Sequence, residues 1–152
     1  MMAHEDKDGD RHDQRQAQQQ VIRDSGWPVI VVPLDYAGPT IGDNILLGWR
    51  DTREAPRAGP DLLTVTKKGT KVKVLRVGKN VQDTMADSDA IDLSEMLSRP
   101  DLKPTLEHRE AKGDAIADVL NNVALESGAE LIAKGATTHA LLRDAKLPIL
   151  IL

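Results

Sequence analysis

Short runs rich in Val, Ile and Leu, separated by segments that can form helices, constrain the fold of this chain most. The clearest runs cover residues 28–33, 44–49 and 147–152, and a fourth at 71–77 ends in the same residue types. Strands that are apolar along their whole length need cover on both faces, as strands of a parallel sheet between helices have. The alternation of such strands with helices predicts an α/β fold.

The complete set of expected elements follows this alternation. We predict strands at residues 28–33, 44–49, 71–77, 103–109, 129–133 and 147–152, and helices at 12–25, from 53, and at 91–97, 113–128 and 138–145. Prolines bracket the first strand, which places it near a sheet edge because proline cannot donate to a strand ladder. Pro60 lies inside the second helix, where it removes a hydrogen bond at a cost of about 3 kcal/mol or more. We expect that helix to be weakened.

The length and composition bound the class of protein. The 152 residues are enough for one compact domain with a single core. The only aromatic residues are Trp27, Tyr36 and Trp49, so the core is expected to consist of Leu, Ile, Val and Ala. The lack of cysteine excludes disulfides, thiolate metal sites and cysteine nucleophiles. A net charge of −4 with scattered basic residues disfavours a nucleic-acid partner.

The polar N-terminal residues bear on domain limits and location. Residues 1–12 are predicted to be a disordered polar tail, and residues 13–152 a single domain. No run approaches the roughly 20 apolar residues of a membrane span. The first 20 residues also lack the apolar stretch of a secretory signal. We therefore expect no membrane partner and a cytoplasmic location.

Four segments together resemble the universal stress protein family, over roughly residues 14–152. Residues 45–58, ILLGWRDTREAPRA, resemble its first strand and helix, and residues 113–136, GDAIADVLNNVALESGAELIAKGA, its third helix and fourth strand. Residues 138–152, THALLRDAKLPILIL, are similar to its last helix and fifth strand. Residues 25–33, SGWPVIVVP, resemble that same last strand, although here they precede the domain.

The resemblance implies a specific architecture. It is a three-layer sandwich around a mainly parallel five-stranded sheet of order 3-2-1-4-5, with an extra N-terminal antiparallel strand beside strand 5. The chain would then be part of a tandem member, in which residues 13–33 are the last helix and strand of a preceding repeat and residues 43–152 the main repeat. The strand at 28–33 would lie beside residues 147–152 and cover the edge of that strand.

A phosphate-binding loop is expected after the fourth strand of family members that bind ATP. Its pattern there is G-x-x-G, about nine residues, and then G-S or G-T, with glycines that let backbone N–H groups approach phosphate oxygens. Gly135 matches the first glycine, and nothing in the following residues matches the rest. Arg50 stands where the family has an Asp that faces the nucleotide. We therefore predict that the chain binds no ATP and has no cofactor.

A ligand site is predicted only as an alternative. If the chain still binds adenine nucleotide or another small anion, Arg50, Gly135, Thr138 and His139 would form the site, because carboxyl ends of strands in open α/β sheets bind small molecules. For Arg50 and His139 an ordinary exposed position is the competing interpretation.

No pattern of catalytic or metal-ligating residues stands out. The four histidines, His4, His12, His108 and His139, lack ligand spacing and are expected at the surface. No nucleophile elbow, P-loop or dinucleotide fingerprint occurs, so we predict no enzyme activity and no metal site.

The predicted function is therefore a role in stress response without ATP, through protein contacts or as a homodimer. A nucleotide or small-anion sensor is the alternative. A duplicate that is losing its role is a third hypothesis, with which Pro56 and Pro60 in one helix are compatible.

Overall fold

The computed structural model describes residues 13–14, 16–17, 20–21, 24–49, 55–78, 95–98, 101–111, 116–134, 141 and 145–152. Its elements are β1 (Val29–Val31), β2 (Asn44–Trp49), α2 (Ala55–Leu63), β3 (Lys71–Gly78), β4 (Lys103–Glu110), α5 (Ile116–Ser127), β5 (Leu131–Lys134) and β6 (Ile149–Ile151). Residues 95–98 are also helical. The structure confirms the predicted α/β class.

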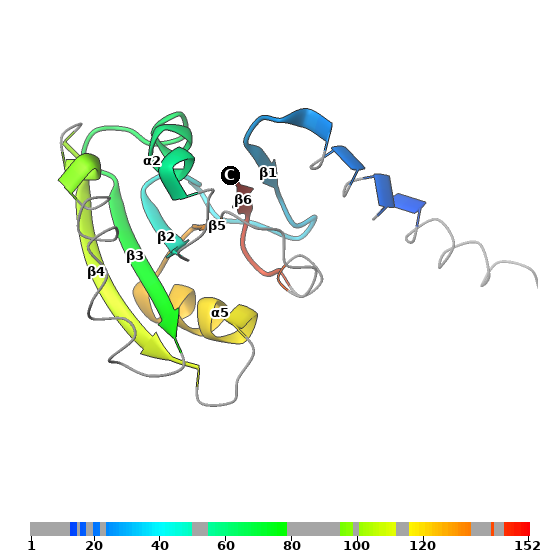
Figure 1. Ribbon diagram of the computed structural model, residues 1–152. Helices are drawn as coiled ribbons and strands as arrows, with labels where there is room; N and C mark the ends of the chain where they lie inside the picture. The colour runs from blue at the N-terminus through cyan, green and yellow to red at the C-terminus, as the bar shows by residue number, and fades with distance from the viewer. Residues whose placement is uncertain are drawn as a thin grey trace, which may run out of the picture.

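The strands form one six-stranded sheet in the order β1-β6-β5-β2-β3-β4 (Figure 1). Strands β2 to β6 pair in parallel. Strand β1 pairs antiparallel with β6, and Val29 lies opposite Ile151. The predicted antiparallel pairing of the N-terminal strand with the last strand is therefore present, and the sheet is mixed with one antiparallel pair.

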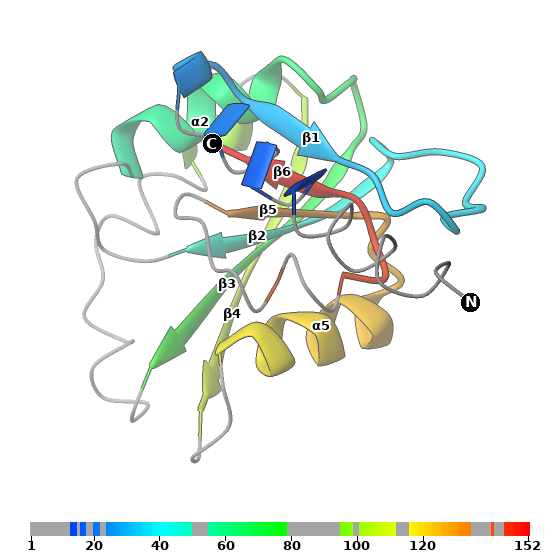
Figure 2. The same ribbon diagram turned by 90° about the vertical axis from the view of Figure 1, so that its right-hand side faces the viewer.

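Helices cover both faces of the sheet, and Figure 2 shows α2 above it and α5 below it. Ile45 and Leu47 of β2 pack with Leu62 of α2 on one face. Leu46, which points the other way because side chains alternate along a strand, packs with Leu120 of α5. The buried members of the two core clusters are all aliphatic in the described part of the chain, as the composition predicted.

Helix α2 continues through Pro60. Pro60 is exposed, so its ring meets solvent rather than the sheet. Two residues later the fully buried Leu62 anchors the helix in the core. Burial of this leucine offsets part of the missing hydrogen bond. The expected weakening of the helix remains a prediction.

The prediction for β5 was wrong at its boundaries, since the strand begins at Leu131 rather than at 129 and extends to Lys134. The backbone N–H of Ala129 donates to the carbonyl of Ala124 in α5 at 2.9 Å, so this residue still belongs to the helix end. Gly128 has a φ of 66°, which ends the helix in the left-handed conformation that glycine tolerates.

Strand β4 is longer than its polar sequence suggests. It pairs with β3 along eight residues, from Lys103 opposite Lys71 to Glu110 opposite Gly78. As the last strand in the sheet order it has a free outer edge in the described part of the chain. Charged side chains and Pro104 suit such an edge because they discourage pairing with other strands.

Candidate functional site

The four residues predicted from the sequence, Arg50, Gly135, Thr138 and His139, lie outside the described residues. Two of them directly follow described strands. Arg50 comes after Trp49, the last residue of β2, and Gly135 comes after Lys134, the last residue of β5. The structure thus places the strands that lead into the predicted site, but not the predicted side chains.

Strands β2 and β5 are parallel neighbours, with Gly48 opposite Lys134. On its other side β2 pairs with β3, which follows it in the chain. The order of strands along the chain therefore reverses at the boundary between β2 and β5. Open α/β sheets bind ligands outside the carboxyl ends of their strands at such a reversal point. This end of the two strands is the candidate site.

Lys134 is the described residue of this site that sequence reasoning missed. It is only 8% exposed. Among the described residues, Lys134 and Thr70 are the two polar residues that are buried. Its carbonyl accepts a hydrogen bond from the N–H of Leu152 at 3.1 Å, which fixes its backbone between β2 and β6. The signal available in the sequence was the position of this lysine, directly after the apolar residues of the run L-I-A-K.

Gly48 of β2 lies opposite Lys134 at the candidate site. A Cβ on Gly48 would lie 3.1 Å from Cδ2 of Leu120, so the glycine allows α5 to approach β2 closely. It also contributes no side chain beside Lys134. Opposite Lys134 on this face, β2 therefore presents the bare backbone of Gly48, with Leu120 of α5 packed against it.

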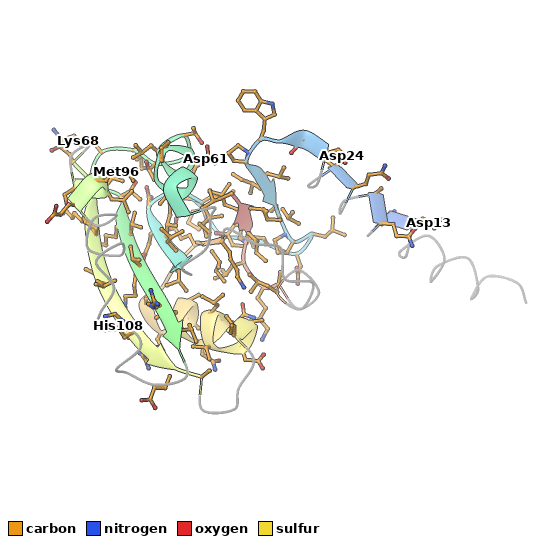
Figure 3. The ribbon with its side chains drawn as sticks, viewed as in Figure 1. Asp13, Asp24, Asp61, Lys68, Met96 and His108 are labelled. Carbon is orange, nitrogen blue, oxygen red and sulfur yellow. The ribbon has the colours of Figure 1, made fainter. Side chains whose placement is uncertain are left out.

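Two polar residues are paired on the α2 face of the sheet, where Arg76 of β3 is opposite His108 of β4. Figure 3 shows His108 well along β4, away from Lys68 and Met96 near the start of that strand. His108 is only partly exposed, and its Nδ1 is buried without a hydrogen-bond partner among the described residues. The expectation of a surface histidine therefore holds only in part.

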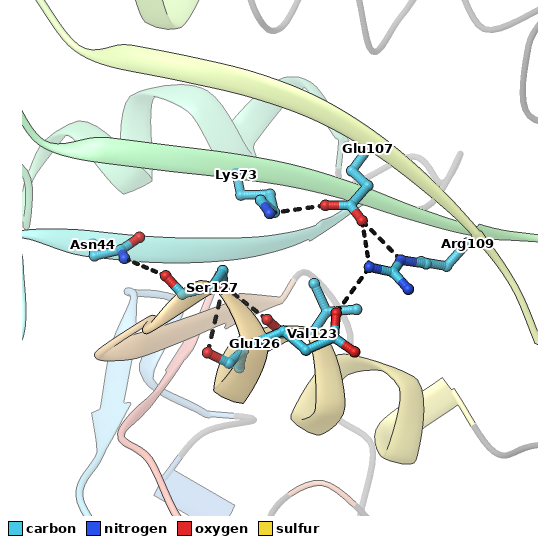
Figure 4. Close-up of polar contacts among 8 residues, drawn as sticks. Asn44, Lys73, Glu107, Arg109, Val123, Glu126 and Ser127 are labelled. Atoms are coloured by element: carbon cyan, nitrogen blue, oxygen red, sulfur yellow. Dashed lines mark hydrogen bonds and ion pairs between the residues drawn. The ribbon is translucent and has the colours of Figure 1, made fainter.

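Four charged residues form a network on the α5 face (Figure 4). Glu107 lies 2.8 Å from the ammonium of Lys73 and accepts a hydrogen bond from Nε of Arg109 at 2.8 Å. Arg109 also reaches Glu126 of α5 at 2.9 Å. The hydrogen bond from Lys73, with a further contribution from Arg109, lowers the pKa of Glu107 below its usual value, although partial burial opposes this.

This network connects β3, β4 and α5 and is best understood as structural. A carboxylate bonded to two cations has a lowered pKa and stays ionised at neutral pH, so it is a poor proton donor or acceptor there. Within the described part of the chain, no three His, Asp or Glu side chains are grouped so that they could hold a metal ion. Nor does any described helix have the length and apolar character needed to cross a membrane.

Comparison with known proteins adds no relative. The chain matches no protein-family model, no curated protein and no solved structure.

Proposed function

We propose that this chain is a universal-stress-type module that binds no ATP and acts in a stress response through protein contacts, as a homodimer. The residues at 45–58, 113–136 and 138–152 support the family, and the pairing of β1 with β6 is compatible with it. The proposal includes the family's three-layer sandwich with main strands in the order 3-2-1-4-5. A cytoplasmic location belongs to it as well and rests on the sequence alone.

The observation that carries the proposal is a concentration of exposed apolar side chains around β1. Of the seven large apolar residues that are exposed in the described part of the chain, five lie between Val21 and Leu34. Trp27 is 80% exposed, and Ile30 and Val32 are also exposed. Clustered apolar residues at a sheet edge favour contact with another protein over a purely solvated surface.

The two edge strands of the sheet, β1 and β4, differ in how apolar they are. The edge strand β4 ends in a charged run that contains Glu107, Arg109 and Glu110, whereas β1 consists only of valine and isoleucine. Charged edges resist pairing with a second chain, and apolar edges do not. A protein contact is therefore expected on the β1 side of the molecule.

Sedimentation equilibrium tests the contact. The wild-type chain should dimerise, and the double variant Ile30→Lys, Val32→Lys should raise the dimer Kd by about tenfold or more, because a buried apolar contact would receive two charges. Leu125→Lys is the matched control, since Leu125 is 62% exposed on α5. A wild-type chain that stays monomeric at high concentration, or a control with the same effect, contradicts the proposal.

Calorimetric titration with ATP and ADP tests the lack of nucleotide binding separately. We expect no heat of binding at micromolar concentrations. Micromolar affinity would contradict this part of the proposal and leave the dimer contact standing.

The alternative is a sensor of nucleotide or another small anion at the candidate site, with Arg50, Gly135, Thr138 and His139 as ligand-binding residues. The position of Lys134 at the strand end favours it, because a cation there attracts anions. A thermal-shift screen with adenine and cyclic nucleotides separates the two functions. The hypothesis of a duplicate losing its role would require that neither dimer nor ligand is found.

A further inference from the structure

Strand β6 turns alternate backbone groups to its two neighbours, β5 and β1. The N–H of Leu152 donates to the carbonyl of Lys134 on β5 at 3.1 Å. Backbone groups of successive residues in a strand point to opposite sides of it, within the plane of the sheet. The N–H and carbonyl groups of Ile149 and Ile151 are therefore directed away from β5 and toward β1.

The antiparallel pairing with β6 then decides which groups of β1 remain for a further strand. Ile151 lies opposite Val29 and Ile149 opposite Val31, so the two valines use their N–H and carbonyl groups within the sheet. Ile30, between them, turns its N–H and carbonyl to the outer edge. Strand β1 ends the strand order and has no second neighbour in the described part of the chain (Figure 2). Such an edge can pair with a strand of another molecule.

The residues around Ile30 make this edge complementary to a copy of itself. A two-fold axis at Ile30 sets this residue opposite Ile30 of a second copy, and each donates its N–H to the carbonyl of the other. The same register sets Val32 opposite Pro28 of the second copy. Pro28 has no N–H, but its carbonyl can accept from Val32, which Pro33 keeps extended. Ile30 and Val32 of each copy thus both donate across the interface.

The side chains that this register brings together are apolar. Val31 packs with the cluster beneath α5, so Ile30 and Val32 point to the other face of the sheet. They are 38% and 48% exposed. On that face Ile30 meets its own copy and Val32 meets Pro28, with no charged side chain among them. Directly opposed apolar pairs of this kind stabilise neighbouring strands.

We propose that two copies of this chain pair edge to edge through β1, antiparallel and centred on Ile30, so that their sheets become continuous. The pairing rests on the proposed homodimer and adds to it a register and a set of backbone hydrogen bonds. A second copy fits this edge because it satisfies the outward donors of Ile30 and Val32 and covers their side chains at the same time.

Cysteine cross-linking tests the register, since the chain has no cysteine of its own. Ile30→Cys should form a disulfide-linked dimer under mild oxidation, because directly opposed residues of antiparallel strands lie within disulfide range. Val32→Cys should cross-link at least about tenfold more slowly, because its two copies are roughly 13 Å apart in this register. Leu106→Cys is the matched control, since Leu106 is 37% exposed on the other edge strand, β4. Non-reducing gels follow the rates.

Removal of the outward donor tests the backbone hydrogen bonds. Ile30→Pro keeps an apolar residue without an N–H, and it spares the pairing with β6 because that N–H faces away from β6. In sedimentation equilibrium the dimer Kd should rise by about tenfold or more, because the hydrogen bond is lost from both copies. Ile30→Val keeps the N–H and should raise the Kd several-fold less.

The results separate this pairing from the homodimer itself. A wild-type dimer in which Ile30→Cys cross-links no faster than Leu106→Cys, or in which Ile30→Pro has no effect, overturns the edge pairing and leaves the homodimer standing. A monomeric wild-type chain overturns both and leaves the edge to a partner other than a second copy. If Ile30→Pro does not fold, the cross-linking rates decide.

Discussion

The carboxylate of Glu107 on β4 lies 2.8 Å from the ammonium of Lys73 on β3, and both side chains are less than one-third exposed. Arg109 joins the same carboxylate to Glu126 of α5. The contacts connect the edge strand, its neighbour and the helix that covers them. Because β4 offers few apolar side chains, this network adds to the backbone pairing with β3 in holding the edge strand in place.

Glu107→Gln should therefore lower the free energy of unfolding at pH 7 by about 1 kcal/mol, since two partly shielded ion pairs are lost. The pKa of Glu107 is lowered in the folded protein, first by Lys73. The stabilisation is thus complete above the usual value near 4.5 and disappears as the pH falls through the lowered pKa. Urea unfolding at pH 7 and pH 3 measures this. Equal stability of both proteins at pH 7 contradicts it.

Asn44 closes the end of α5 from the start of β2. Its Nδ2 donates to the carbonyls of Ser127 at 2.9 Å and Gly128 at 3.1 Å. Asn44→Ala should lower the free energy of unfolding by about 1–2 kcal/mol, because the carbonyls at the helix end lose these donors. Asn44→Asp should cost at least as much, since it adds negative charge at the negative end of the helix dipole. Thermal unfolding of both variants compares them, and an aspartate variant more stable than the alanine variant would reject this account.

The sequence predicted the elements because apolar periodicity is local. Ile45 to Leu47 and Ile149 to Ile151 are buried on both faces, so the run of apolar residues alone indicated a covered strand. The ends of elements were harder to predict. Ala129 looks like a strand residue in sequence, but its N–H is bonded to α5, and such a bond depends on where the chain turns.

The candidate site was only partly predictable. The carboxyl ends of β2 and β5 could be inferred from the expected alternation, whereas the burial of Lys134 could not. It depends on β6 pairing with β5 on one side and β2 pairing on the other, which are contacts between distant residues. The pairing of Lys73 with Glu107 likewise needs the register of β3 with β4, which no local pattern supplies.

Gly48 sets the distance between β2 and α5, because a Cβ there would lie 3.1 Å from Cδ2 of Leu120. The nearest atom is the end of a flexible side chain, so Gly48→Ala should be nearly neutral. Gly48→Val adds branched bulk to the contact and should lower the free energy of unfolding by about 1–3 kcal/mol. Combining it with Leu120→Val should recover part of that loss. A double-mutant cycle by urea unfolding measures the coupling, and strict additivity would show that the two side chains do not compete for this space.

Pro60 leaves the carbonyl of residue 56 without its helical partner, since the ring has no N–H to donate. Because Pro60 is exposed, replacing it removes little packing. Pro60→Ala should therefore stabilise the protein by about 1–3 kcal/mol, less than the full helix penalty because the unfolded chain gains freedom. For a chain of this size that corresponds to a Tm higher by roughly 3–10 °C. Asp61→Ala is the control, because it improves helix propensity at the next position without restoring a backbone hydrogen bond. A Tm that rises no more in Pro60→Ala than in the control would show that α2 has already adapted to its proline.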